Sequence, residues 1–381
     1  MKKFPDLSRN HILAIFLSLA IVGTYSLLPN SHEQPVAAAN ISVTAQQFSK
    51  YIQDWSEPEG YFDSDNFISN ETSYQHVVDR LRNQVRPGNV YIGVGPEQNF
   101  TYIAHTRPSL AIIVDIRRQN MLQHLLFKAL FDQARSRSEY LALLFAKEKP
   151  TVPRSAPLKD ILSALRSAPS NEQLFQRHLQ DASAVLTEKY KVVLTADDLK
   201  KFEYVYRTFW SQNLDLRFSS IGRGNAMNYP TYERLLLETD QNGHLQNYLS
   251  SDELFQWLKK FQSENRLIPI VGDFGGSQAF QAVSAFLKQN SLQVSTFYTS
   301  NVEFYLFNTL SWPAFMKNVH ALPVAQDGVF VRAYFGSFGR GHPLNVVGHR
   351  STSLVHQMIP FMKDYDAGRI PTYWEVVDRN K

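Results

Sequence analysis

Two glycines spaced one residue apart follow an apolar run in the stretch VYIGVGPEQNF, which contains Gly93 and Gly95. Glycines at this place allow a sharp turn and let a ligand approach the backbone beside the positive end of the next helix. Asp115 comes 20 residues after Gly95, which is the spacing at which a carboxylate at a strand end accepts both hydroxyls of a ribose. These residues predict a nucleoside-type ligand. The alternatives are a tight turn without a ligand and an Asp115 that forms a salt bridge with Arg117 or Arg118.

Glu97 stands near the place where a phosphate-binding fingerprint carries its third glycine. Beside a bound pyrophosphate its charge would cost roughly 4 kcal/mol, at a distance of about 4 Å and an effective dielectric of about 20. We therefore expect Glu97, together with Asn99 of the same turn, to contact a ligand that has a positive centre and no phosphate. Alternatively, the negative charge of Glu97 only interacts favourably with the positive end of the helix dipole, with no ligand present.

Further polar side chains come directly after two later apolar runs. Asp273 could orient a substrate or accept a hydrogen bond from a cofactor amine, and its alternative role is to stabilise the turn. Asn301, Glu303 and Tyr305 follow the next run, and we expect them to be catalytic residues that position an acceptor substrate. Asn301 could instead cap the helix that begins there. Ligands of doubly wound sheets bind outside the carboxyl ends of the strands, so all these residues are expected at one edge.

An alternation of apolar runs and helical patterns must position these residues. It predicts an α/β fold with a doubly wound, Rossmann-like and mostly parallel sheet, because parallel strands require helical crossovers and are buried on both faces. The expected strands are residues 90–94, 110–114, 268–271, 293–298 and, as the last strand, 328–335.

Helical spacing predicts two of the intervening elements. Apolar residues between 74 and 81 predict a helix with Glu71 in its first turn and with Ser69 or Asn70 as its N-cap. An amphipathic helix is expected over residues 121–134.

A longer helical region interrupts the alternation between about residues 147 and 265. We expect this region to be a mainly helical insertion within a single α/β domain that spans residues 46–381.

The N-terminal segment, residues 1–39, has the pattern of a signal peptide or membrane anchor with a polar tether. Lys2, Lys3 and Arg9 precede an apolar run over residues 12–28 that contains no charge. We expect an anchored protein that faces the periplasm or extracytoplasmic space, or a secreted protein if the segment is cleaved. The membrane is then a partner through residues 12–28 of the uncleaved chain. A buried helix of the soluble domain is the alternative.

Composition excludes several kinds of site. The chain has no cysteine, which excludes disulfides, thiolate metal sites and a cysteine nucleophile. Lys and Arg number 39 against 35 Asp and Glu, with no block of like charge, so we expect no nucleic-acid partner. The 11 histidines include no pair at metal-ligand spacing on one helix, so no metal site is expected.

A serine hydrolase is one alternative, based on the segment GGSQA. Ser277 in this segment is similar to a nucleophile elbow, and Asp327 and His342 follow it in the required order. The segment ends in Ala279 where the elbow prefers glycine, and no oxyanion segment precedes it. We therefore rank this alternative last.

The order of elements, the GVG turn, Asp115 and the strand ends VGDF and YTSNVE together resemble the class I methyltransferases, which bind S-adenosylmethionine. The segments YFDSDNFISNETSY, YIGVGPEQNFTYIA and VDIRRQN also resemble a bacterial family of uncharacterised proteins with that fold. The likeness covers about residues 58–375. The resemblance implies a methyltransferase-type sheet in which Gly93 and Gly95 contact S-adenosylmethionine and Asp115 holds its ribose.

Two features depart from the methyltransferase pattern. Tyr91 stands where these enzymes usually carry an acidic residue two positions before the first glycine, and no Asn-Pro-Pro-Tyr motif follows Val271. Export adds a conflict, because S-adenosylmethionine is made in the cytosol. We expect a methyltransferase-like protein that binds S-adenosylmethionine or a related small-molecule ligand, with a non-catalytic binding or interaction protein of the same fold as the alternative.

Overall fold

The computed structural model describes residues 41–220, 229–336 and 340–378, and all of them belong to one compact unit. The apolar run over residues 12–28 and its polar tether lie outside the described residues. Within the described ranges, no helix is both long enough and apolar enough to cross a membrane.

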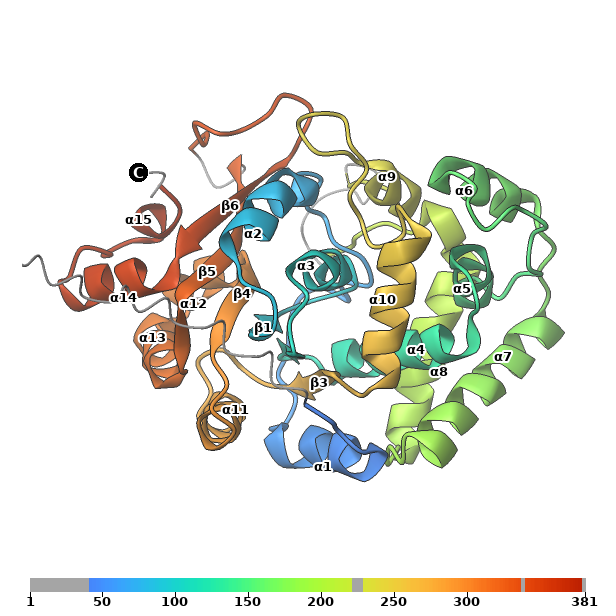
Figure 1. Ribbon diagram of the computed structural model, residues 1–381, viewed down its shortest axis with the longest axis horizontal. Helices are drawn as coiled ribbons and strands as arrows, with labels where there is room; N and C mark the ends of the chain where they lie inside the picture. Colours follow the sequence, from blue (N-terminus) through green and yellow to red (C-terminus); the bar gives the residue numbers. More distant parts are fainter. Residues whose placement is uncertain (1–40, 221–228, 337–339, 379–381) are drawn as a thin grey trace, which may run out of the picture. The chain divides into compact units, whose positions relative to one another are not determined.

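A six-stranded sheet forms the centre of the protein (Figure 1). Its strands lie in the order β3-β2-β1-β4-β5-β6; β1 to β5 are parallel, and β6 pairs antiparallel with β5. This arrangement confirms the predicted α/β class and the mostly parallel sheet, and it is consistent with a Rossmann-like fold. The strand order reverses between β1 and β4, which makes this place the switch point of the sheet. The strands are β1 (Val90–Gly93), β2 (Leu110–Asp115), β3 (Leu267–Val271), β4 (Val294–Ser300), β5 (Val324–Phe335) and β6 (Ser351–Gln357).

The prediction that residues 328–335 form the last strand is wrong, because β6 follows them. Two buried serines of β6 explain the error. Ser351 Oγ and Ser353 Oγ lie 2.8 Å and 3.0 Å from the Ser73 hydroxyl, which satisfies their hydrogen bonding inside the protein. A strand whose polar side chains find buried partners lacks the apolar run by which strands are recognised in a sequence.

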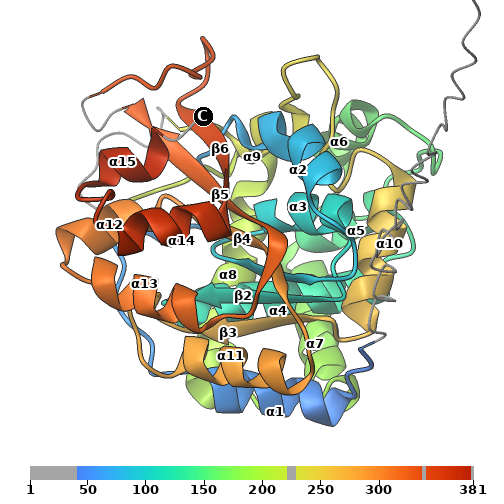
Figure 2. The same cartoon turned by 60° about the vertical axis from the view of Figure 1, so that its left-hand side comes forward.

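Helices cover both faces of the sheet (Figure 2). On one face α3 packs against α2 and α10, and α4 packs against β2 and β3; on the other face α11 packs between α1 and α13. The helices outside the long region between β2 and β3 are α1 (Ala45–Trp55), η1 (Tyr74–Val77), α2 (Val78–Gln84), α3 (Gln98–Thr106), α11 (Ala279–Gln289), α12 (Val302–Asn308), α13 (Trp312–Ala321), α14 (Met358–Asp366) and α15 (Tyr373–Val377).

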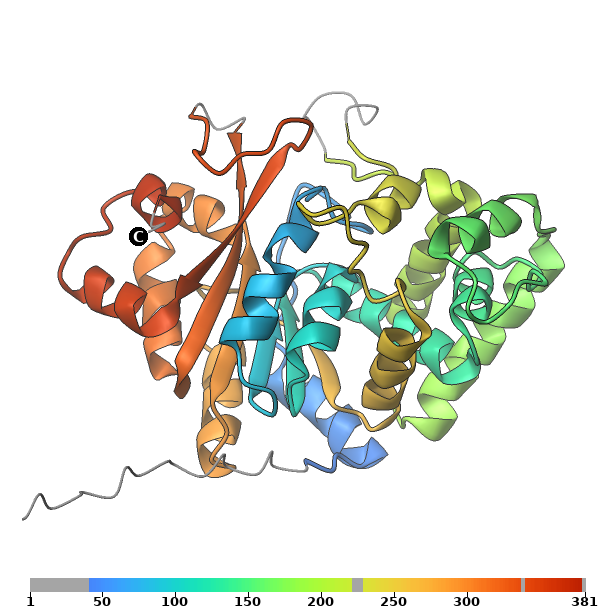
Figure 3. The same cartoon turned by 45° about the horizontal axis from the view of Figure 1, so that its top comes forward.

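The region between β2 and β3 is helical and contains no strand of the sheet in its described residues (Figure 3). Its helices are α4 (Arg118–Gln133), α5 (Arg137–Leu144), α6 (Leu158–Ser167), α7 (Glu172–Ala184), η2 (Val185–Lys189), α8 (Ala196–Gln212), η3 (Asn213–Asp215), α9 (Tyr232–Leu237) and α10 (Asp252–Ser263). The amphipathic helix predicted over residues 121–134 is α4, but every residue from Asn120 to Phe131 is buried. The predicted helix is present, and it is buried on all sides because α8 and α10 also pack against it.

Many helices begin at a side-chain oxygen that accepts a hydrogen bond from a backbone N–H of the first turn. Such N-caps satisfy donors that the helix itself leaves unpaired. These N-caps begin α1, α5, α7, α8, α9, α10 and α15: Thr44, Ser136, Asn171, Thr195, Thr231, Ser251 and Thr372.

Candidate functional site

Residues 56–73, which we call the strap, run along the carboxyl edge of the sheet. The backbone N–H of Glu57 donates to the carbonyl of Val271 at the end of β3 (3.1 Å), and Gly60 N–H donates to Ile116 just after β2 (2.9 Å). At the other end of the strap, Thr72 Oγ1 accepts from the N–H of the residue before β6 (3.3 Å). The strap therefore covers the edge at which a Rossmann-like sheet binds its ligands.

The turn after β1 is held by its own side chains. Asn99 Nδ2 donates to the carbonyls of Val94 (2.9 Å) and Pro96 (2.7 Å), and the Tyr91 hydroxyl donates to Asn99 Oδ1 (2.8 Å). A Cβ atom at Gly93 would lie 2.0 Å from Asn99 Oδ1, so this position requires glycine for internal packing. The contacts of Gly93 and Asn99, both predicted to bind the cofactor, thus lie within the protein.

Gly95 differs from Gly93 because its φ is +78°, in the left-handed region that glycine adopts at no steric cost. A Cβ atom there would have no atom within 4 Å, so space remains beside this residue. Its carbonyl accepts a hydrogen bond from His124 Nε2 (2.8 Å), and burial lowers the pKa of His124 to about 4. Gly95 is therefore the glycine of the turn that a ligand could approach.

Asp115 is fully occupied by Arg117. Arg117 Nε donates to Asp115 Oδ1 (2.9 Å), and Arg117 Nη2 donates to Oδ2 (2.7 Å). The two side chains are 4% and 9% exposed, respectively. Arg117 also donates to the carbonyl of Ser64 in the strap (3.0 Å). This is the salt-bridged arrangement that the sequence left open, and a ribose could reach Asp115 only after Arg117 moved.

Asp273 closes the turn after β3. Its Oδ1 accepts from the N–H of Gly275 (2.9 Å), and its own backbone N–H donates to the carboxylate of Glu57 in the strap. These contacts give Asp273 the turn-stabilising role that the sequence offered as its alternative. They also place the carboxylate residues Glu57 and Asp273 next to each other at the end of β3.

Glu303 lies in a fully buried ion pair with Arg332 of β5. Arg332 Nε lies 3.0 Å and 2.9 Å from the two carboxylate oxygens, and both side chains are 0% exposed. The guanidinium carbon lies 4.2 Å from the ring centroids of both Phe330 and Phe361. Glu303, predicted to be catalytic, therefore joins α12 to β5 and does not face the carboxyl edge as a free carboxylate.

Asn301 and Tyr305 are the two predicted catalytic residues that lie half-buried at the carboxyl edge. Asn301 occupies the N-cap position of α12 without a capping hydrogen bond from its side chain. The Tyr305 ring packs edge-on against Phe62 of the strap, with centroids 5.1 Å apart. The Arg117 guanidinium carbon lies 5.8 Å from the Phe62 ring, so aromatic and cationic groups meet beside Asn301.

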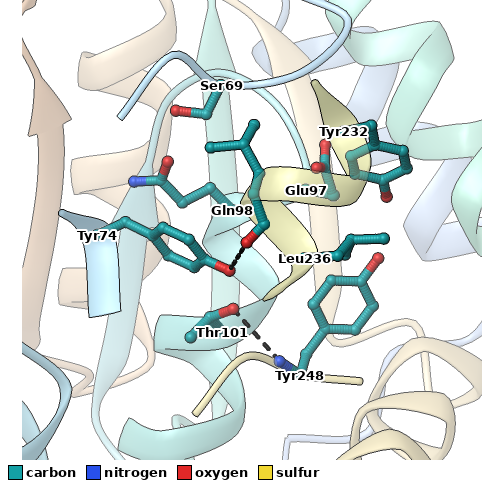
Figure 4. Close-up of a pocket in the computed structure, with 9 residues that line it drawn as sticks. Ser69, Tyr74, Glu97, Gln98, Thr101, Tyr232, Leu236 and Tyr248 are labelled. Carbon is teal, nitrogen blue, oxygen red and sulfur yellow. Dashed lines mark hydrogen bonds between the residues drawn. The ribbon is translucent and has the colours of Figure 1, made fainter. Parts of the chain in front are cut away.

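Glu97 faces a small cavity between α3 and α9 (Figure 4). The cavity is lined by Tyr74, Tyr232 and Tyr248, and the space open to the centre of a water molecule is about 10 Å³, roughly what one water needs. Burial raises the pKa of Glu97 to about 8. Glu97 is therefore mainly uncharged at neutral pH, unlike the anionic ligand contact that we predicted.

Glu71 is the residue at the switch point that sequence reasoning missed. The helix predicted over residues 74–81 is present as η1 and α2, but its predicted start is wrong, since η1 begins at Tyr74 and Glu71 belongs to the strap. Its carboxylate is 1% exposed and accepts from Gln98 Nε2 (2.8 Å), the Tyr298 hydroxyl (2.7 Å) and Ser300 Oγ. Burial raises the pKa of Glu71, while these three donors lower it. No local pattern could reveal contacts more than 200 residues away along the chain.

Other carboxylates give the carboxyl edge a negative character. Among the described residues, no cationic side chain lies within ion-pair distance of the carboxylates of Glu57, Asp63, Asp65 and Asp273, whereas Glu59 pairs with Lys201. Asp65 Oδ2 accepts a hydrogen bond from the Tyr204 hydroxyl (3.0 Å), a neutral donor. The edge thus offers several acceptors to a cationic ligand.

The residues of the hydrolase alternative have other partners. Ser277 is exposed. Asp327 Oδ2 accepts from the backbone N–H of Arg86 (3.1 Å), and His342 Nε2 lies 3.2 Å from the carbonyl of Val377. No contact joins these three residues in the described part of the chain.

The sheet and its strap define an α/β protein of Rossmann-like architecture with an acidic, covered carboxyl edge. Within that class, the chain belongs to the family described as a domain of unknown function, DUF7790, whose profile matches residues 66–367. No curated protein matches the chain.

Proposed function

We propose that this protein binds a cationic small molecule, S-adenosylmethionine or a related adenosyl ligand, at the carboxyl edge beside the switch point. The observation that carries the proposal is a group of four strap and strand-end carboxylates that have no ion-pair partner among the described residues: Glu57, Asp63, Asp65 and Asp273. A sulfonium and an ammonium group would complement such an edge, whereas a pyrophosphate would be repelled.

The strand order is compatible with a methyltransferase-type version of the Rossmann-like fold, although dinucleotide-binding proteins share this order. The order 3-2-1-4-5-6 places the switch point between β1 and β4, next to Gly95. The Phe62–Tyr305 pair offers ring faces on which an adenine could stack, and the Asn301 amide could hydrogen-bond its edge. The ligand would lie between the strap and α12.

The same geometry favours binding without methyl transfer. Asp115 is engaged by Arg117, and Glu303 by Arg332, so neither is poised to hold a ribose or to orient an acceptor. A fold can be kept when its chemistry is lost. We therefore place a non-catalytic binding protein first and a methyltransferase that uses Asn301 and Tyr305 second.

Calorimetry with matched ligands tests the proposal. S-adenosylmethionine should bind more tightly than S-adenosylhomocysteine, which has the same adenosine but no sulfonium charge, and a nicotinamide dinucleotide should bind most weakly. A preference for the dinucleotide, or no binding of any adenosyl ligand, would contradict it.

A methyl-transfer assay separates the two ranked functions. The full-length chain, incubated with methyl-labelled S-adenosylmethionine and a panel of small carboxylate and amine acceptors, should transfer no label if the protein only binds. Transfer that is lost in Tyr305→Phe would instead favour the methyltransferase.

Export or membrane anchoring through residues 12–28 is part of the proposal. An alkaline phosphatase fusion at the C-terminus should be active if the domain faces the extracytoplasmic side. In that case the natural ligand would be a cationic adenosyl compound available outside the cytosol. An inactive phosphatase fusion together with a fluorescent-protein fusion that is fluorescent would place the domain in the cytosol. Because S-adenosylmethionine is made there, the domain would then have access to it.

A further inference from the structure

Two hollows lie beside β6, away from the strand ends that carry the proposed adenosyl site. The first has a volume of about 190 Å³ and lies between η1, α2 and β6. The second, of about 220 Å³, lies between the end of β5, the segment 341–350 and β6. Thr352 lines both hollows, and Figure 3 shows α2 alongside β6. The two hollows are therefore neighbours on one side of β6.

Hydrogen-bond donors and basic groups line these hollows. His76 and Arg80 line the first, and His349 and Arg350 line the second. None of the described residues that line either hollow is an aspartate or a glutamate. Asp240 is a carboxylate that acts electrostatically on His76, and it already accepts hydrogen bonds from two backbone N–H groups at 2.8 Å. The lining therefore favours an anion.

A pair of histidines joins the two hollows. The rings of His76 and His349 lie 4.6 Å apart at 71°. His349 Nδ1 is buried and has no hydrogen-bond partner among the described residues. Burial, and to a smaller extent the neighbouring His349, lower the pKa of His76 to about 4, while Asp240 opposes this shift. An anion bound between the two rings would stabilise a protonated imidazole.

We propose that the hollows beside β6 form a binding site for a small oxyanion, held by His76, His349 and Arg80. The ligand would carry either a carboxylate group or a tetrahedral, phosphate-like group. The anion would accept hydrogen bonds from the imidazoles and the guanidinium and would compensate their charge. Thr352 and Asn345, whose side chains lie 3.3 Å apart, would supply further polar contacts. The site is independent of the proposed adenosyl ligand.

Proton uptake should accompany binding. The groups that face His76 are His349 from segment 341–350, Arg80 from α2 and Asp240 from the segment after α9, while the lining residues of β6 do not titrate. An anion between the two imidazoles favours their protonated forms. Affinity for an anion of fixed charge should therefore rise as the pH falls from about 8 to about 6.

Calorimetry on the full-length chain tests this site with sulfate and citrate at constant ionic strength set by chloride. Sulfate keeps its charge over this pH range, so any pH dependence belongs to the protein. Arg80→Ala and His349→Ala should each weaken binding roughly tenfold, which corresponds to about 1.4 kcal/mol. If only one of the two anions binds, the result still supports the site and shows whether it selects a tetrahedral anion or a carboxylate.

Matched control variants are available at an arginine and a histidine that lie outside the hollows. Arg82→Ala removes an arginine of α2 that pairs with Asp79, and His320→Ala removes a histidine that pairs with Asp366. Neither lines a hollow, so both should bind sulfate as the unmodified chain does. The proposal would be overturned if neither anion binds, or if Arg80→Ala and His349→Ala bind sulfate as tightly as the unmodified chain does. Affinity for S-adenosylmethionine should stay unchanged in all four variants, whichever way the adenosyl proposal is decided.

Discussion

Asp115 and Glu303 show how a carboxylate at a strand end can serve the fold as well as a ligand. Each binds an arginine through both of its oxygens and is almost completely shielded from water. Burying such a pair is offset only when the geometry is good, and removing one partner leaves a buried charge. Substitutions at these two residues can therefore separate a structural role from a ligand-binding role.

Asp115→Ala should lower the free energy of unfolding by about 3–5 kcal/mol, because Arg117 would be left buried without its carboxylate partner. The affinity for an adenosyl ligand should stay unchanged, because Arg117 already occupies both oxygens of Asp115. Denaturant unfolding without ligand measures the stability, and calorimetry on the folded variant measures the affinity. Weaker ligand binding with unchanged stability would show that Asp115 contacts the ligand instead.

Glu303→Gln should lower the free energy of unfolding by about 3–5 kcal/mol, because Arg332 would keep its charge without a partner. The double variant Glu303→Leu with Arg332→Met should lose less, since it buries no charge. Denaturant unfolding of the three chains checks this order. A double variant less stable than Glu303→Gln would contradict it.

Glu97 should make stability depend on pH. The pKa of Glu97 is raised from 4.5 to about 8 in the folded protein. Between these two pH values the folded state keeps a proton on Glu97 that the unfolded state has already lost. The contribution of Glu97 to folding stability is therefore fully present below pH 4.5 and is lost as the pH rises toward about 8. Glu97→Gln should flatten this part of the stability profile in denaturant unfolding. If the stability profiles of the variant and the unmodified chain run parallel, Glu97 does not titrate in this pH range. Glu71 does not affect the comparison, because both chains contain it.

The elements fall into those that the sequence predicts well and those that depend on distant partners. β1, β2 and β3 are buried at every residue, so each appears as a short apolar run followed by a turn. β6 and the strap could not be predicted in this way. The Ser73–Ser351 contact joins residues 278 positions apart, and the polar character of both segments is typical of a loop unless that partner is known.

Gly60→Ala should loosen the strap. A Cβ atom there would lie 2.5 Å from the side chain of Ile116, so either that side chain or the strap must shift at the end of β2. We expect a cost of about 1–3 kcal/mol and faster hydrogen exchange of the backbone amides in residues 56–73. Gly341→Ala is the control, because a Cβ atom at Gly341 meets no atom within 4 Å. Equal exchange in the two variants would show that the strap does not depend on this contact.

At the scale of the whole molecule, the sequence locates the candidate edge but not the state of its side chains. Gly93, Asp115 and Asp273 do lie at successive strand ends. The partners Asn99 and Glu57 could not be assigned, because a side chain's partner is decided by three-dimensional packing. For Asp115 the sequence narrowed the partner only to Arg117 or Arg118, and the structure has Arg117. The family match over residues 66–367 includes these strand ends but begins within the strap.

The strap has a consequence for how the protein is made. It precedes β1 in the chain, yet it is fastened to β3 and to the start of β6, which are synthesised much later. Contacts between such distant segments form slowly, because a long loop must close first. During translation the strap therefore has no complete support until residues 351–353 have emerged. The carboxyl edge would be finished last, so a nascent chain could not hold its ligand before synthesis is nearly over.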